Sequence, residues 1–283
     1  MTTYAVTGSS GQLGRKIVHA LLDLHVSPFD IIALARDTTT VEDLAALGVR
    51  VRHADYDEPA TLDGALEGVD RLVLVSGSEI GKRVDQHRAV LAAAERAGVA
   101  RIAYTSLLKA DSSSVGLAPE HVETEQALAG SSIETTVLRN SWYTENYTAQ
   151  IPGYVERGAI VAAAGDATVS TATRADFADA AAAAITADSV KPVYELAGTS
   201  FTFAELAQAI STETGTDVTY TSVTVEDLAA GMVAGGMDEG SAQFWASLDA
   251  SIAQGDLFTE STDLRDLIGR EPTSLEDAVR AAR

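Results

Sequence analysis

Residues 7–14 read Thr7-Gly8-Ser9-Ser10-Gly11-Gln12-Leu13-Gly14, with glycines at intervals of three. The stretch begins where the strand-like run Tyr4–Thr7 ends, and it opens a segment with one apolar helical face. In such a turn the first glycine permits the bend, the second admits a pyrophosphate to the backbone, and the third lets the helix pack closely. We therefore predict a dinucleotide bound at the helix N-terminus, on Gly8, Ser9, Ser10, Gly11, Gln12, Leu13 and Gly14.

Strand-length runs recur after this turn, at Ile31–Arg36, Val49–Asp55, Arg71–Ser76, Arg101–Ser106 and Ile133–Arg139. Helical periodicity separates them, and this alternation is typical of a parallel sheet with helices on both faces. Beyond about residue 141 the rhythm breaks up, and Gly231–Gly240 reads as a glycine-rich loop. We predict an α/β, Rossmann-type doubly wound sheet in residues 1–140 and a smaller mixed C-terminal lobe in 141–283. Segments near 172–198 are expected to return to the first domain.

Composition narrows the classes of partner. The formal net charge is −21, which disfavours nucleic acid because its affinity for proteins comes largely from Lys and Arg. Cysteine is absent, so disulfides and thiolate chemistry are excluded. No apolar run has the length of a membrane helix. We expect a cytoplasmic monomer or homodimer with a small-molecule partner, and the spacing of the histidines predicts no metal site.

The end of the second strand bears on the choice of cofactor. Arg36 stands where NADP-dependent proteins place an arginine near the 2′-phosphate, whereas Asp37 comes one residue too late to hold the ribose hydroxyls as in NAD-dependent ones. The alternative is that Arg36 is an exposed charge paired with Asp37. We predict NADP(H).

The other strand ends supply small and polar residues. Asp55 and Tyr56 can reach the adenine or simply form a turn, and Ser76, Gly77 and Ser78 leave room for the middle of the cofactor. The Thr105 and Ser106 hydroxyls face the nicotinamide ribose or cap their own loop. These residues complete a predicted site at the carboxyl edge of the sheet.

The chain resembles the type 2 NAD(P)H:quinone oxidoreductases of the NmrA-like group of atypical short-chain dehydrogenases. The resemblance extends from end to end and is carried by 7–14, Arg36, 103–108, 120–125 and, most specifically, Leu138-Arg139-Asn140-Ser141-Trp142-Tyr143-Thr144-Glu145-Asn146-Tyr147. It implies that the 2′-phosphate lies on Arg36 and the central ribose on Ser76–Glu79. It also implies that Asn140, Trp142, Tyr143 and Glu145 border the nicotinamide and that Arg174 reaches the cofactor. From the residues alone, the aromatic cluster is equally typical of core packing.

Ordinary short-chain dehydrogenases carry Tyr-x-x-x-Lys, in which lysine lowers the tyrosine pKa for proton exchange with an alcohol or ketone. Here Leu117 and His121 occupy those two places. A quinone needs less help because it is strongly electrophilic, so the loss disfavours alcohol–ketone chemistry more than quinone reduction. His121 is a candidate to orient the ribose or supply a proton, or it makes a structural hydrogen bond. Tyr143 and Asn146 are candidates to contact the acceptor, Tyr143 also as a catalytic group.

Three hypotheses follow. The first is an NADPH-dependent reductase that transfers hydride to a quinone or similar planar electrophile. The second is a redox-sensing regulator that binds NADP(H) without turnover, as some NmrA-like proteins do. The third is a reductase of azo or triphenylmethane dyes or of imines. Acceptor choice is expected to depend on a pocket built by Trp142–Tyr147 and Gly231–Phe244.

Overall fold

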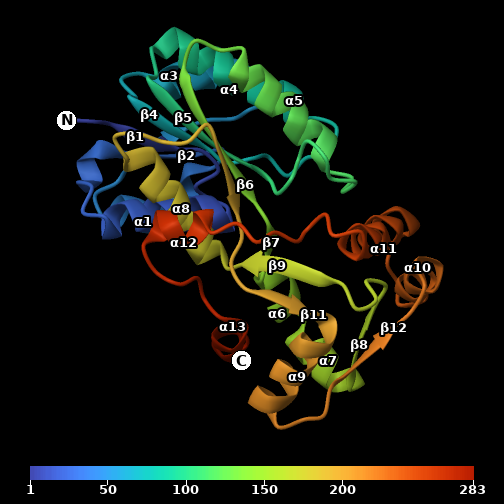
Figure 1. Ribbon diagram of the computed structural model, residues 1–283. Helices are drawn as coiled ribbons and strands as arrows, with labels where there is room; N and C mark the ends of the chain where they lie inside the picture. Colours follow the sequence, from blue (N-terminus) through green and yellow to red (C-terminus); the bar gives the residue numbers. More distant parts are fainter.

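The computed structural model describes every residue from Met1 to Arg283, and a seven-stranded parallel sheet forms its centre (Figure 1). The order of strands across the sheet is β10-β6-β5-β4-β1-β2-β3. Their bounds are β1 (Tyr4–Val6), β2 (Ile31–Ala35), β3 (Arg50–His53), β4 (Arg71–Leu74), β5 (Arg101–Leu107), β6 (Glu134–Asn140) and β10 (Val193–Leu196). The chain runs from β1 outward to β2 and β3, then crosses back to β4 on the other side of β1. This reversal confirms the predicted doubly wound fold and places the carboxyl ends of β1 and β4 at a switch point, where open α/β sheets bind ligands.

Helices cover both faces of the sheet (Figure 1). One face carries α1 (Gln12–Asp23), α8 (Arg174–Thr186) and α12 (Asp263–Ile268), and the other carries α3 (Pro59–Leu66), α4 (Arg83–Ala97) and α5 (Ala118–Ala129). Between β2 and β3 lie only the short η2 (Thr38–Val41) and α2 (Glu42–Ala46), while η1 (Pro28–Asp30) precedes β2. Fully buried side chains such as Ile17 and Phe177 on one face and Leu62 and Tyr104 on the other form the two cores. The inner strand β2 is therefore apolar and buried on both sides, as expected for a parallel sheet, whereas the edge strand β3 carries Arg50, Arg52 and His53.

The remaining elements form a smaller lobe with two short sheets. One has the order β11-β9-β7, and the other pairs β12 with β8. Its core contains Tyr147, Phe201, Phe203 and Ile252. The elements are β7 (Trp142–Tyr143), α6 (Glu145–Thr148), α7 (Ile151–Arg157), β8 (Ala159–Ala162), β9 (Thr168–Ala172), β11 (Ser200–Thr202), α9 (Phe203–Thr214), β12 (Thr219–Ser222), α10 (Val225–Ala234), α11 (Glu239–Ala253) and α13 (Leu275–Ala281). The mixed character predicted for this lobe is confirmed.

Two elements from the second half of the chain lie in the large sheet layer. β10 pairs in parallel with β6, with Tyr194 opposite Leu138. α8 packs beside α1, and eight of its residues are buried, most of them alanines whose small side chains permit close approach. The Rossmann layer is thus completed by residues that follow the first strands of the small lobe.

The glycine-rich stretch 231–240 differs from the predicted loop. Gly231 lies within α10, and α11 begins at Glu239, so only a short turn separates two helices. Asp238 explains the early start of α11, because its side chain accepts a hydrogen bond from the backbone N–H of Ser241 at 2.9 Å. No helix of the protein combines the length and apolar character that crossing a bilayer demands.

Candidate active site

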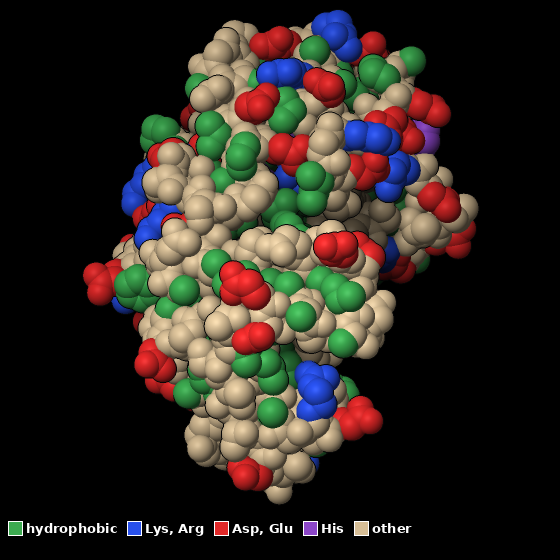
Figure 2. All heavy atoms as spheres, turned by 90° about the vertical axis from the view of Figure 1, so that its right-hand side faces the viewer, with side chains coloured by type: hydrophobic (Ala, Val, Ile, Leu, Met, Phe, Trp, Pro, Cys, Tyr) green, Lys and Arg blue, Asp and Glu red, His purple; other side chains and the backbone are tan.

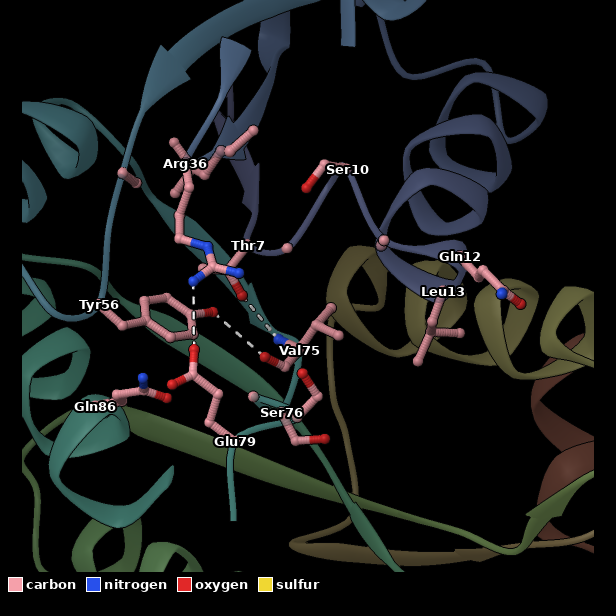
Figure 3. Close-up of a pocket in the computed structure, with 18 of the residues that line it drawn as sticks. Thr7, Ser10, Gln12, Leu13, Arg36, Tyr56, Val75, Ser76, Glu79 and Gln86 are labelled. Carbon is pink, nitrogen blue, oxygen red and sulfur yellow. Dashed lines mark hydrogen bonds and ion pairs between the residues drawn. The ribbon is translucent and has the colours of Figure 1, made fainter. Parts of the chain in front are cut away.

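A cavity of about 340 Å³ opens at the switch point, along the carboxyl ends of β1 to β4 (Figure 3). Six of the seven predicted turn residues line it, together with Arg36, both predicted residues after β3, and the segment after β4. Tyr143 and Arg174 join from the second half of the chain. The lining residues are Thr7, Gly8, Ser10, Gly11, Gln12, Leu13, Gly14, Leu34, Ala35, Arg36, Ala54, Asp55, Tyr56, Val75, Ser76, Gly77, Ser78, Glu79, Gln86, Tyr143 and Arg174.

The turn into α1 has the form of an anion cradle. Gly8 adopts φ +59°, a conformation that favours glycine, and a β-carbon on Gly14 would collide with the Gly8 carbonyl. Gly11 is the N-cap of α1, and no side chain caps the helix or places an acid in its first turn. The N–H groups of Gln12, Leu13 and Gly14 have no backbone partner, so they leave the positive end of the helix dipole at the cavity. These features fit the pyrophosphate of a dinucleotide, and a side chain at Gly14 would push the helix away from the turn.

Arg36 stands at the end of β2 beside this cradle. Its side chain is 66% exposed, and Nη1 lies 3.3 Å from Glu79 Oε1, an ion pair visible in Figure 3. The predicted alternative partner, Asp37, instead caps η2 by accepting from the Thr39 N–H at 3.0 Å. Because an exposed ion pair contributes little, the guanidinium is available to a phosphate at the cavity edge.

Tyr56 and Gln86 form the wall opposite the turn (Figure 3). The Tyr56 hydroxyl donates to the Val75 carbonyl at 3.3 Å, and burial raises the pKa of this phenol above its ordinary value. Gln86, on α4, donates to Asp57 at 3.1 Å. The phenol ring offers a flat apolar surface of the kind that an adenine contacts.

The segment after β4 is held by a buried polar network. Gly77 donates its N–H to His87 Nε2 at 3.0 Å, and its carbonyl accepts from Arg83 Nε at 2.7 Å. Arg83 Nη1 also donates to Glu120 at 2.7 Å. Since Nε2 must accept, His87 is neutral and donates from Nδ1 to Thr124, and burial lowers its pKa to about 3. The network fixes Ser76–Glu79 at the cavity wall.

Tyr143 and Arg174 close the far end of the cavity. The Arg174 guanidinium carbon lies 4.2 Å from the centre of the Tyr143 ring, whose phenol pKa burial raises. Arg174 also donates to Asn146 Oδ1 at 3.1 Å, and its backbone N–H donates to Glu145 at 2.9 Å. Glu145 and Asn146 thus position Arg174 rather than line this cavity.

Several predicted residues lie elsewhere. The Ser9 hydroxyl donates to Val6 at 2.8 Å, Thr105 accepts from the Ser76 N–H at 2.9 Å, and Ser106 donates to Glu125 at 2.5 Å. Asn140 is 5% exposed, and its Oδ1 has no partner. None of these four side chains lines the cavity, so the structure gives them supporting rather than contacting positions.

His121 is likewise separated from the cavity. It is 5% exposed, and its Nδ1 lies 2.8 Å from the Tyr104 hydroxyl in the core beneath α5. Burial lowers its pKa to about 3, with a smaller contribution from the Arg83 charge. A neutral, enclosed imidazole corresponds to the structural alternative stated for this residue.

A second cavity, of about 670 Å³, lies in the small lobe. Trp142, Asn146 and Tyr147 meet Gly231, Met232, Met237 and Trp245 there, so the two segments predicted to shape an acceptor pocket do come together. Trp142 and Trp245 pack edge to face with centroids 6.4 Å apart. Figure 2 faces the side that carries α10 and α11 and shows the molecule hollowed at mid-height. We call the cavity of about 670 Å³ the acceptor cavity.

The two cavities share a wall. Tyr143 faces the first and its neighbour Trp142 the second, as alternation along β7 requires. The Arg174–Asn146 hydrogen bond joins a lining residue of one cavity to a lining residue of the other. Sequence reasoning missed four of these residues, which carry no motif: Arg83, Gln86 and His87 of α4 and Asp249 of α11.

Comparison with known proteins agrees with this geometry. The model of the NmrA-like family matches residues 2–244. Quinone oxidoreductase 2 of Escherichia coli strain K12 is 46% identical over 277 residues, which cover 97% of this chain and 96% of that protein. These matches confirm the resemblance predicted from the sequence.

Solved structures of related reductases have the same fold as this chain. The crystal structure of an NADPH-dependent quinone oxidoreductase from E. coli, complexed with NADPH, superposes with a TM-score of 0.95 at 44% identity and covers 99% of both chains. The triphenylmethane reductase of Citrobacter sp., complexed with NADP(H), has a TM-score of 0.94 at 36% identity, with 99% of this chain and 100% of the other covered.

Proposed function

The chain belongs to the NmrA-like family, and from that membership we propose that it is an NADPH-dependent oxidoreductase that transfers hydride to a quinone or a similar planar electrophile. One observation carries the proposal: the uncapped N-terminus of α1, Arg36 and Arg174 face the same cavity at the switch point of the sheet. The helix N-terminus and Arg36 suit the phosphates of a dinucleotide, and Arg174 with the Tyr143 ring offers a wall for the hydride-donating end.

We assign the cofactor as follows. The first turn of α1 binds the pyrophosphate through backbone N–H groups, Arg36 binds the 2′-phosphate, and Tyr56 contacts the adenine. Ser76–Glu79, held by Arg83 and His87, binds the central ribose. Tyr143 and Arg174 form the wall at the nicotinamide end. When bound, the reduced nicotinamide supplies the hydride, and the protein supplies position and exclusion of water.

The absence of the Tyr-x-x-x-Lys pair agrees with this chemistry. Leu117 and His121 stand in those places, and His121 is enclosed with Tyr104 away from both cavities. A ketone would lack its proton donor there, whereas a quinone accepts hydride to form an aromatic hydroquinone anion, which takes its proton from water. The acceptor cavity, with its aromatic walls, suits a flat ring system.

Turnover tests the proposal directly. Purified protein is mixed with NADPH and a panel of small benzoquinones and naphthoquinones, and loss of NADPH absorbance is followed against protein-free controls. We expect oxidation that depends on both protein and quinone. Cofactor binding by calorimetry without oxidation of any acceptor would favour the sensing alternative instead.

Dye reduction is a second candidate. The acceptor cavity is larger than the cavity at the switch point, which we call the cofactor cavity. Its walls include Trp142, Trp245, Tyr154 and Phe203, and such aromatic walls accommodate ligands of more than one ring. The similarity to a triphenylmethane reductase supports the same candidate. A triphenylmethane dye added to the panel decides between them through the ratio of kcat/KM values.

A further inference from the structure

The acceptor cavity contains two buried polar groups that its apolar lining does not explain. Tyr147 is 7% exposed, and its hydroxyl has no hydrogen-bond partner in the chain. Asp249, on α11, is partly buried at the same wall. Buried polar groups are almost always paired, so an unpaired hydroxyl beside a carboxyl in a cavity is typical of a binding site.

Asp249 has one oxygen engaged and one free. Oδ2 accepts a hydrogen bond from the Ala163 N–H at 2.7 Å. Oδ1 makes no hydrogen bond within the chain, and no Lys, Arg or His lies within ion-pair distance of either oxygen. The N–H fixes the direction of the carboxyl, and the second oxygen is left to the cavity.

The neighbouring groups leave this carboxyl uncompensated. Tyr147 on α6, Tyr154 and Arg157 on α7, Tyr220 on β12 and Asp227 on α10 are the titratable or charged groups around it. The Arg157 guanidinium lies 5.7 Å from the centre of the Tyr154 ring and pairs with no acid, and Asp227 is exposed at the rim. Burial raises the pKa of the three phenols above the ordinary value, so none of them ionises near neutral pH.

Burial also raises the pKa of Asp249 to about 6, and the Ala163 N–H opposes this only in part. The carboxyl therefore carries a proton in mildly acidic solution. Because Oδ2 accepts, the proton belongs on Oδ1, the oxygen that has no partner within the chain.

We propose that Asp249, as a neutral carboxyl, donates a hydrogen bond from Oδ1 to a carbonyl oxygen of the acceptor. A quinone carbonyl can only accept, so a pocket that recognises it needs donors among apolar walls. Asp249 is thus a specificity-determining residue that selects ring systems bearing carbonyl groups. The inference rests on the proposed function for the identity of the acceptor.

The chain's only two tryptophans, Trp142 and Trp245, both line this cavity and make binding visible without turnover. Protein saturated with NADP⁺, which cannot reduce a quinone, is titrated with 1,4-naphthoquinone while tryptophan quenching is measured. If only the protonated form binds, the apparent Kd rises by up to about 100-fold between about pH 5 and about pH 8, because the protonated fraction falls by that factor. Naphthalene, which lacks the carbonyls, should bind with the same Kd at both pH values.

Three variants test whether the Asp249 carboxyl is the cause of the pH dependence of quinone binding. Asp249→Asn keeps an oxygen for the Ala163 N–H and presents an amide donor, so its Kd should stay within about twofold across this pH range. Asp249→Leu removes the donor and should bind the quinone weakly at both pH values. Asp227→Asn, which changes a carboxyl at the exposed rim, should keep the wild-type pH dependence.

Three results would overturn the inference: no quenching at either pH, an equal pH dependence for naphthalene, or an Asp249→Asn variant that still follows the wild-type profile. A failure of the proposed function differs from these, because it would appear as absent NADPH oxidation while binding of the quinone and its pH dependence remained intact.

Discussion

At the scale of single residues, we expect nucleotide preference to depend on Arg36. Its exposed pair with Glu79 costs little to break, and a 2′-phosphate would replace it with a charge-assisted hydrogen bond. NADH offers no phosphate at this position. The two cofactors therefore differ mainly in what this guanidinium can contact.

We expect Arg36→Ala to weaken NADPH binding by about 10- to 100-fold, since hydrogen bonds to charged groups contribute about 1.5–3 kcal/mol. NADH binding should change by less than about threefold, because the lost side chain has no phosphate to contact. Calorimetric titration with both cofactors measures this. Arg88→Ala, an exposed arginine on α4 that lines neither cavity, is the control. Equal losses for NADPH and NADH would show that Arg36 does not read the 2′-phosphate.

At Gly14 a single added methyl group tests whether the turn into α1 binds the pyrophosphate. An added β-carbon would meet the Gly8 carbonyl, so Gly14→Ala should abolish detectable NADPH binding and destabilise the fold by about 1–3 kcal/mol. Gly64 in α3 has nothing within 4 Å of its would-be β-carbon, and Gly64→Ala should stabilise by about 0.5–1 kcal/mol. Urea unfolding and cofactor titration measure both. A Gly14→Ala variant with normal affinity would contradict the role given to this turn.

At the scale of elements, the sequence predicted more of the fold than of the site. Most strands of the large sheet, such as β2, left an apolar run, and the glycines of residues 8–14 marked the β1–α1 turn, because these features arise from local chain chemistry. Thr105 and Ser106 were placed at the right strand end, but their hydroxyls turn to Ser76 and Glu125. Which partner a hydroxyl finds depends on packing between elements, and no local pattern encodes it.

The same limit explains why the sequence did not indicate the polar residues of α4 and α11 that reach the site. Gln86 and Asp249 reach their cavities, and His87 reaches Gly77, because of how the helices pack, and a single polar residue on a helix gives no signal of that kind. The stretch 231–240 shows the reverse error, since glycines suggested a loop where the Asp238 cap and packing of the helix pair produce helices.

His121, a buried residue of α5, should make stability depend on acidity. Its folded pKa is about 3, below the ordinary value of 6.5, so only the unfolded chain takes up its proton as the pH falls through 6.5. The stabilising contribution is complete above that pH and is lost on acidification. Between about pH 7 and about pH 5 wild-type protein should lose about 2 kcal/mol more than His121→Gln, at about 1.4 kcal/mol per pH unit.

Urea unfolding at the two pH values measures this difference. His19→Gln is the matched control, because His19 is exposed on α1 and should leave the wild-type loss unchanged. An equal loss in wild type and His121→Gln would mean that His121 is charged in the folded protein.

At the scale of the whole molecule, the large sheet draws on both halves of the chain. β10 and α8 lie in the same layer as β6 and α1, and Arg174 at the start of α8 lines the cofactor cavity. A fragment of residues 1–150 would leave β6 as an edge strand and expose the apolar faces that α8 covers.

We therefore expect the 1–150 fragment to aggregate or to remain molten, and to bind NADPH at least about 100-fold more weakly than the full chain, since it loses Arg174 and the cover of α1. Gel filtration, near-ultraviolet circular dichroism and cofactor titration test this. A monomeric fragment with native-like spectra and ordinary affinity would show that residues 1–150 fold as an independent unit.

Because β10 completes the sheet, the order of synthesis also affects when the Rossmann layer can fold. A ribosome releases the glycine turn first, yet the layer that supports it lacks its last strand until residue 196 has emerged from the exit tunnel. Early nascent chains should therefore depend on chaperones. The ability to bind the nucleotide should appear late in translation, once β10 has emerged, rather than increase gradually.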